Sequence, residues 1–225
     1  MRILNHKRKN SKRRAAFVFI APAMFFLFVF SVIPMMYSFG ISFLSYNMSM
    51  AEDTIHFTGF DNYIGVLTNK QFLDSALWTF NFTISAVALN VILGMALALL
   101  LTSGYSKRIS KVCKTIFTMP MMIAPIVTAT IWKLIFSPIY GVLNGILVTF
   151  GFERVNWMAE TIPARIALVI VEVWATTPLC MLIFIAALQT VPDDLLEAAT
   201  IDGGTFPQKF TKVILPLIRN FIALV

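Results

Sequence analysis

Long segments without a charged residue constrain this chain more than any other feature of its sequence. Residues 15–44 and 75–101 contain no Asp, Glu, Lys or Arg. A bilayer core of about 30 Å requires about 20 apolar residues in a helix, so each segment can cross a membrane. Of the 225 residues, 58% are hydrophobic and only 13% are charged, whereas a soluble domain has about 25% charged residues. The composition excludes intrinsic disorder and argues strongly against a water-soluble globule.

The sequence predicts an all-α, polytopic helical membrane protein with one domain over residues 15–225. The third predicted span carries Pro120 and Pro125 near its start, and the fourth contains Arg165 at its second residue and Glu172 farther inside. A last apolar run is too short to span and reaches Val225 without a polar flank, so we expect the natural protein to continue. The predicted spans are 15–44, 75–101, 115–136 and 164–188, with a fifth starting at 213–225.

Positive charges gather between the predicted spans. Seven of the 18 Lys and Arg residues lie in a basic tail over residues 1–14, and four lie in the predicted loop 102–114. With four spans, the tail 1–14 and the loops 102–114 and 190–212 lie on the same side of the membrane. That side carries thirteen basic residues, and the other side carries four. The positive-inside rule therefore places the N-terminus in the cytoplasm. An RNA-binding tail is the competing interpretation of residues 1–14, but the distribution favours membrane topology and no nucleic-acid partner.

Catalytic and metal-binding patterns are missing from the sequence. The two histidines, His6 and His56, and the two cysteines, Cys113 and Cys180, lack metal-ligand spacing, and both cysteines are predicted to be free thiols. No glycine is followed by lysine, so the phosphate-binding loop of ATPases is absent. We therefore predict no catalytic residue, no metal site and no cofactor on this chain.

The polar loop 190–212 has the pattern of two short helices around a glycine turn. Thr190 and Asp193 fit a capping box for the first helix, and Gly203-Gly204 can adopt positive φ and end it. Thr205 can cap the second helix. An ordinary connecting loop is one interpretation of this segment. The other is an exposed helix that seats in the groove of another protein.

The same loop carries a specific motif. Glu197-Ala198-Ala199-x-x-Asp202-Gly203, followed by Phe210, Val213, Leu215 and Pro216, resembles the E-A-A…D-G…F…I-x-L-P signature of permease subunits of binding-protein-dependent ABC importers. Residues 57–63, 136–144, 156–157 and 172–178 resemble the branch that takes up maltose, other sugars or glycerol phosphate. The likeness extends from about residue 15 to the end. Gly204, Pro207, Val213 and Asn220 depart from the usual family pattern.

The resemblance implies the transmembrane fold of a type I ABC importer, in a prokaryotic inner or plasma membrane. It implies four partner subunits: an extracytoplasmic solute-binding protein, a second permease subunit, and two cytoplasmic subunits that bind ATP-Mg. The motif residues would couple this chain to an ATPase subunit, with Glu197 in contact and Gly203 setting the turn. The implied coupling residues are Glu197, Ala198, Ala199, Asp202, Gly203, Leu215 and Pro216.

Glu172, with Trp174 and Pro178, is the candidate for the substrate path. A carboxylate within an apolar span is costly and should face the bundle interior or a cavity, where Trp174 could stack on a sugar. A structural partner for another helix, or a hydrated position near the outer interface, is the alternative role of Glu172. For the whole chain, the alternatives are an ion-coupled secondary transporter, which has no reason to carry the 197–216 motif, and a membrane enzyme, for which catalytic groups are missing.

Overall fold

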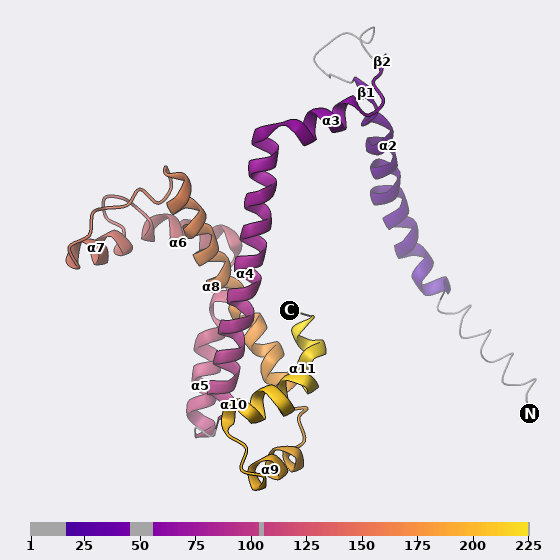
Figure 1. Ribbon diagram of the computed structural model, residues 1–225. Helices are drawn as coiled ribbons and strands as arrows, with labels where there is room; N and C mark the ends of the chain where they lie inside the picture. Colours follow the sequence, from indigo (N-terminus) through magenta and orange to yellow (C-terminus); the bar gives the residue numbers. More distant parts are fainter. Residues whose placement is uncertain (1–16, 46–55, 104–105, 225) are drawn as a thin grey trace, which may run out of the picture. The chain divides into compact units, whose positions relative to one another are not determined.

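The computed structural model describes residues 17–45, 56–103 and 106–224, and the predicted basic tail lies outside them. Two compact units, residues 1–76 and 77–225, are described separately. Helices account for nearly all regular structure in the described residues (Figure 1), which confirms the all-α prediction. Three of the described helices are long and apolar enough to cross a membrane: Phe17–Ile41, Lys70–Thr102 and Thr161–Leu188.

The first unit contains the first predicted span and the segment that follows it. The apolar helix Phe17–Ile41 includes a π-helical turn, η1 (Phe28–Val32), and α2 (Ile33–Ile41). Strands β1 (Leu44–Ser45) and β2 (His56–Phe57) then form a short antiparallel ladder before α3 (Asp61–Thr68). The Asn62 amide of α3 donates hydrogen bonds of 2.9 Å to the carbonyls of Ser42 and Leu44. These bonds fasten the start of α3 to the end of the first span.

Helix α4 (Lys70–Thr102) is longer than the predicted second span. Its 33 residues extend about 50 Å at about 1.5 Å per residue, well beyond a hydrocarbon core of about 30 Å. The extra turns precede residue 75 and include Lys70 and Asp74. Charged residues marked the N-terminal limit of the apolar run in the sequence, but a helix can continue through charged residues whose side chains reach water.

The core of the second unit forms where α4 packs on α8 (Thr161–Leu188). Small or polar residues recur every fourth position along α4, which places them on one face, and all of them are buried. Gly94 lies so close to α8 that a Cβ there would be 2.7 Å from the Cys180 Cβ. Such close approach is how membrane helices gain packing contacts. The buried face consists of Ala86, Asn90, Gly94 and Ala98.

The third predicted span, 115–136, is not one helix. The structure has α5 (Lys107–Thr118), a 3₁₀ turn η3 (Pro120–Met122) and α6 (Pro125–Ile135). Ile123 and Ala124 are extended, with ψ of 132° and 139°, because the residue before a proline disfavours helix and proline has no N–H to donate. The predicted basic loop 102–114 is also corrected, since α5 begins at Lys107.

The remaining elements follow the predictions more closely. Helix α7 (Val142–Thr149) occupies the apolar stretch between the third and fourth predicted spans. Helix α8 begins three residues before the predicted span and keeps Pro178 inside it. The fifth apolar run forms a π-helical turn, η4 (Phe210–Ile214), and α11 (Leu215–Ile222). Between α8 and η4 lie α9 (Asp193–Ile201) and α10 (Phe206–Lys209), which Figure 1 shows beyond the C-terminal end of α8.

Candidate functional site

Helix α9 starts differently from the sequence prediction. The capping box of Thr190 and Asp193 does not form, because the Thr190 hydroxyl donates instead to the Ala187 carbonyl at 2.7 Å. Thr190 thus satisfies a carbonyl at the end of α8, and Pro192 occupies the N-cap position of α9. Asp193 and Asp194 lie in the first turn, where negative charge is favoured by the helix dipole.

A turn with two glycines ends α9, and a different structural constraint favours glycine at each of the two positions. Gly203 has φ of +72°, the left-handed conformation that glycine adopts without steric cost, as predicted. Its N–H donates to the Thr200 carbonyl at 3.1 Å, and the Gly204 N–H donates to the Ala199 carbonyl at 2.9 Å. This is the Schellman pattern of helix ends. Gly204 does not have positive φ, but a Cβ there would lie 2.6 Å from the Ala199 carbonyl oxygen.

Helix α10 folds back beside α9 and is held there. Thr205 is the N-cap residue of α10, as predicted, and its N–H donates to the Gln208 side chain at 2.8 Å within a capping box. The Lys209 ammonium donates to the Thr200 hydroxyl at 3.2 Å and links the two helices. We call residues 193–209 the α9–α10 hairpin. These bonds give it a defined shape before any partner binds.

The α9–α10 hairpin presents its motif residues outward. Glu197, Ala198, Asp202 and Gly203 are exposed, and Ala199 is half-buried. Large apolar side chains of the same hairpin are also exposed: Ile201 is 86% exposed, Phe206 59% and Leu195 45%. Exposed apolar side chains gathered on one small element favour contact with another protein.

Both ends of the hairpin are anchored in the core of the second unit. Val191 precedes α9 and is buried, as are Ile214 and Ile218 after α10. These three pack in one cluster with Ala98 of α4 and Phe184 of α8. Leu215 is half-buried and Pro216 is exposed within the first turn of α11. Displacement of the hairpin would therefore move side chains that contact α4 and α8.

The hairpin does not pack flush against the long helices. A cavity of about 270 Å³ separates them, lined mainly by apolar side chains from α4, α8 and the hairpin. Leu196 of α9 and Phe206 of α10 reach it from one side, and Leu99 of α4 and Leu188 of α8 from the other.

The predicted substrate-path residues lie on α8 and do not form one cluster. Glu172 is half-buried, and its carboxylate accepts a hydrogen bond of 2.8 Å from the Thr176 hydroxyl. Trp174 packs edge-to-face on Trp132 of α6, with ring centroids 5.6 Å apart. Two residues along a helix correspond to about 200°, so Glu172 and Trp174 face opposite sides. Pro178 is buried in the core.

Sequence reasoning missed two features of this unit. One is the buried pair of Asn90 and Thr177, which an isolated Asn in an uncharged run could have signalled. The other is an aromatic chain, in which Phe136 contacts Trp132 at 5.2 Å and Trp157 at 5.4 Å between centroids. It borders an apolar cavity of about 310 Å³. Within the described residues, the Trp132 indole N–H is buried without a hydrogen-bond partner.

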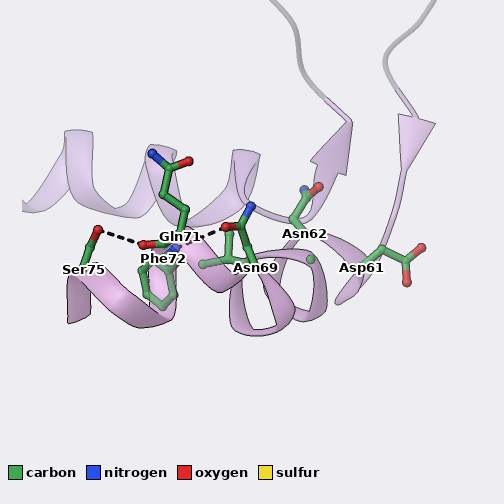
Figure 2. A pocket seen from close by; sticks show the side chains of 8 residues that line it. Asp61, Asn62, Asn69, Gln71, Phe72 and Ser75 are labelled. Atoms are coloured by element: carbon green, nitrogen blue, oxygen red, sulfur yellow. Dashed lines mark hydrogen bonds between the residues drawn. The ribbon is translucent and has the colours of Figure 1, made fainter. Parts of the chain in front are cut away.

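The first unit has an open hollow of about 610 Å³ where α3 meets α4 (Figure 2), and most of the residues around it are polar. Asn69 lies between the two helices, and its side-chain oxygen accepts from the Phe72 N–H at 3.2 Å. The Ser75 hydroxyl donates to the Gln71 carbonyl at 2.8 Å. These bonds order the junction, while Asp61 and the Gln71 amide remain exposed along the hollow.

Comparisons with known proteins agree with the motif. The family described as "Binding-protein-dependent transport system inner membrane component" matches residues 90–224. The chain is 35% identical to the trehalose/maltose transport system permease protein MalF of Thermococcus litoralis, over 96% of this chain and 72% of that protein. It is 31% identical to the galactooligosaccharides transport system permease protein GanP of Bacillus subtilis, over 92% of this chain and 51% of that protein.

Solved structures share the fold. A crystal structure of a bacterial alginate ABC transporter, in complex with an alginate pentasaccharide-bound periplasmic protein, contains a chain that superposes with a TM-score of 0.80. The two chains are 24% identical, and the match covers 96% of this chain and 71% of that one. A second structure of a bacterial ABC transporter that imports alginate superposes with a TM-score of 0.77 at 23% identity, over all of this chain and 73% of that one.

Proposed function

This chain belongs to the family of inner membrane components of binding-protein-dependent transport systems, and we propose that it is one permease subunit of an ATP-driven importer for a sugar or oligosaccharide. Relatives named for trehalose/maltose and galactooligosaccharides support this substrate class. The observation that carries the proposal is the preformed α9–α10 hairpin, which exposes Glu197 and Ala198 and is anchored in the core at both ends.

In the proposed mechanism, α9 seats in a groove on one of two cytoplasmic subunits that bind ATP-Mg. Glu197 contacts that subunit, and Asp202 and Gly203 hold the turn that fixes the angle between α9 and α10. When the ATPase subunits close, the hairpin moves with them. Val191 and the segment 214–218, which includes Leu215 and Pro216, carry this motion to α4 and α8. A second permease completes the translocation pathway. The motion closes this pathway on one side of the membrane and opens it on the other.

The proposed topology places the N-terminus and the α9–α10 hairpin in the cytoplasm of a prokaryotic cell. The excess of Lys and Arg on that side supports this orientation. The α3–α4 junction then lies outside, and its exposed polar groups suit contact with an extracytoplasmic solute-binding protein. Polar side chains such as Asp61 and Gln71 can contact that protein reversibly through bridging water molecules.

For the substrate path, we propose that Glu172 supplies a polar group to the sugar and that Trp174 and Pro178 set the shape of α8 around it. The cost of a carboxylate in a span supports an interior position for Glu172. Uptake of several labelled sugars by Glu172→Gln tests this role, because removing the charge should alter the rate or the preference among them. Unchanged uptake and preference would assign Glu172 to structure alone.

Reconstitution in liposomes tests the function as a whole. The permease pair, the ATPase subunits and the solute-binding protein are combined, and uptake of a labelled oligosaccharide is measured. We expect uptake to require ATP and the binding protein. Uptake without ATP, driven by an ion gradient through this chain alone, would instead establish the secondary transporter.

A further inference from the structure

Helix α5 is attached to the rest of the second unit by one face only. The Ser110 hydroxyl is buried and donates to the Leu101 carbonyl of α4 at 2.7 Å. Cys113, three residues on, is half-buried against the core cluster. These contacts orient the helix and decide which of its other side chains point away from the protein.

The free surface of α5 combines cations with apolar side chains. Arg108, Lys111 and Lys114 recur every three residues and form a basic strip; Arg108 and Lys111 are exposed and Lys114 is half-buried. A strip of three apolar side chains runs beside it, and each is more than half exposed. These are Ile109 at 56%, Val112 at 54% and Ile116 at 54%.

The position of these three cations favours the binding of an anion from outside the protein. They begin in the first turn of α5, where the helix dipole disfavours positive charge, and that turn has no acidic residue. In the described part of the chain, no carboxylate is paired with any of the three. An anion bound at this end would offset both the mutual repulsion of the cations and their conflict with the dipole.

A basic strip beside an apolar strip has the chemistry of a bilayer boundary. We propose that the exposed surface of α5, formed by the basic and the apolar strips, binds the headgroups of anionic phospholipids while Ile109, Val112 and Ile116 contact their acyl chains. Charge complementarity selects an anionic lipid over a zwitterionic one. The apolar strip selects a lipid over free phosphate, because a free anion would leave these side chains uncovered.

The test is lipid binding by the full chain in its importer complex, measured by native mass spectrometry in detergent. Phosphatidylglycerol and phosphatidylcholine are titrated separately. In the double variant Arg108→Gln, Lys111→Gln, we expect phosphatidylglycerol to bind at least about tenfold more weakly, since each cation near an anionic surface contributes about fivefold. Phosphatidylcholine binding should not change, and added salt should weaken only phosphatidylglycerol binding to the wild type.

Two variants serve as matched controls. Lys70→Gln, Lys133→Gln removes two cations elsewhere and should bind phosphatidylglycerol like the wild type. Arg108→Lys, Lys111→Arg keeps the charge and should also bind normally, which separates loss of charge from loss of fold. Wild-type affinity in the Gln variant of α5 would overturn the proposal. So would displacement of the lipid by glycerol phosphate, or crosslinking of a photoreactive label on Val112→Cys to another subunit instead of a lipid. None of these readouts measures transport, so a negative result for lipid binding would not contradict the proposed function.

Discussion

The hydroxyl of Thr177 in α8 donates a hydrogen bond of 2.9 Å to the side-chain oxygen of Asn90 in α4, and both residues are buried. This bond ties together the two long helices that support the α9–α10 hairpin. Between apolar helices such a bond also fixes their register, because a shift along either helix would leave both groups without a partner.

Loss of this bond should lower the stability of the helix pair. We expect Thr177→Val to destabilise the folded permease by about 0.6–1.7 kcal/mol, the range for hydrogen bonds between membrane helices. Thermal unfolding in detergent measures the effect. Thr83→Val is the control, because the Thr83 hydroxyl donates to the Thr79 carbonyl of its own helix. Equal unfolding temperatures for both variants would show that the Asn90–Thr177 bond adds nothing.

Gly94 should not tolerate even one methyl group. In Gly94→Ala the new Cβ would lie 2.7 Å from the Cys180 Cβ and 3.1 Å from the Met181 nitrogen. Overpacking of this kind costs about 1–3 kcal/mol. Gly145→Ala in α7 is the matched control, because its Cβ meets nothing within 4 Å, and it should be neutral or slightly stabilising. A Gly94→Ala permease as stable as the control would contradict the close packing of α4 on α8.

Replacement of either glycine of the hairpin turn by alanine should destabilise the turn. Gly203→Ala places a side chain at φ of +72°, at a cost of about 1–2 kcal/mol. Gly204→Ala brings a Cβ to 2.6 Å from the Ala199 carbonyl oxygen and should loosen the end of α9. Limited proteolysis of residues 200–205 measures the loosening, with Gly65→Ala as the control. Resistance to the protease in both turn variants would mean that the turn relaxes without cost.

The two cysteines should differ in reactivity. Cys180 is buried between α4 and α8, whereas Cys113 is half-buried on α5. A maleimide in water should therefore label Cys113 in the folded permease and label Cys180 only after denaturation. Mass spectrometry of peptides from Cys113→Ser and Cys180→Ser variants identifies the labelled site. Rapid labelling of Cys180 in the native protein would show that α4 and α8 separate readily.

The sequence was most informative where charge or motif alone decided the structure. Long apolar runs located the spans near Phe17–Ile41 and Thr161–Leu188, and the glycine turn after Ile201 was expected from its residue types. Interruptions were harder to predict. The third span was predicted as continuous through Pro120 and Pro125, but whether a proline bends or ends a helix depends on neighbours that satisfy the freed carbonyls.

Side-chain partnerships were not predictable from one sequence. The roles of Thr190 and Gly204 depend on carbonyls of Ala187 and Ala199 that only the folded backbone brings near. The opposed directions of Glu172 and Trp174 follow from helix periodicity and could have been anticipated. The aromatic contacts of Trp132 and Phe136 could not, because Trp132 contacts Trp174 of α8 and Phe136 contacts Trp157 in the segment before α8.

The most direct test of the central claim is co-purification of the full chain with its ATPase subunits, comparing Gly203→Asp with Gly151→Asp. Both glycines have positive φ, +72° and +84°, and neither would meet another atom within 4 Å of an added Cβ. They differ in place, since only Gly203 belongs to the α9–α10 hairpin. We predict that Gly203→Asp inserts in the membrane but loses the ATPase, while Gly151→Asp retains it. Equal retention of the ATPase by both variants, with normal ATP-driven uptake, would contradict the proposal that the hairpin couples this permease to ATP hydrolysis.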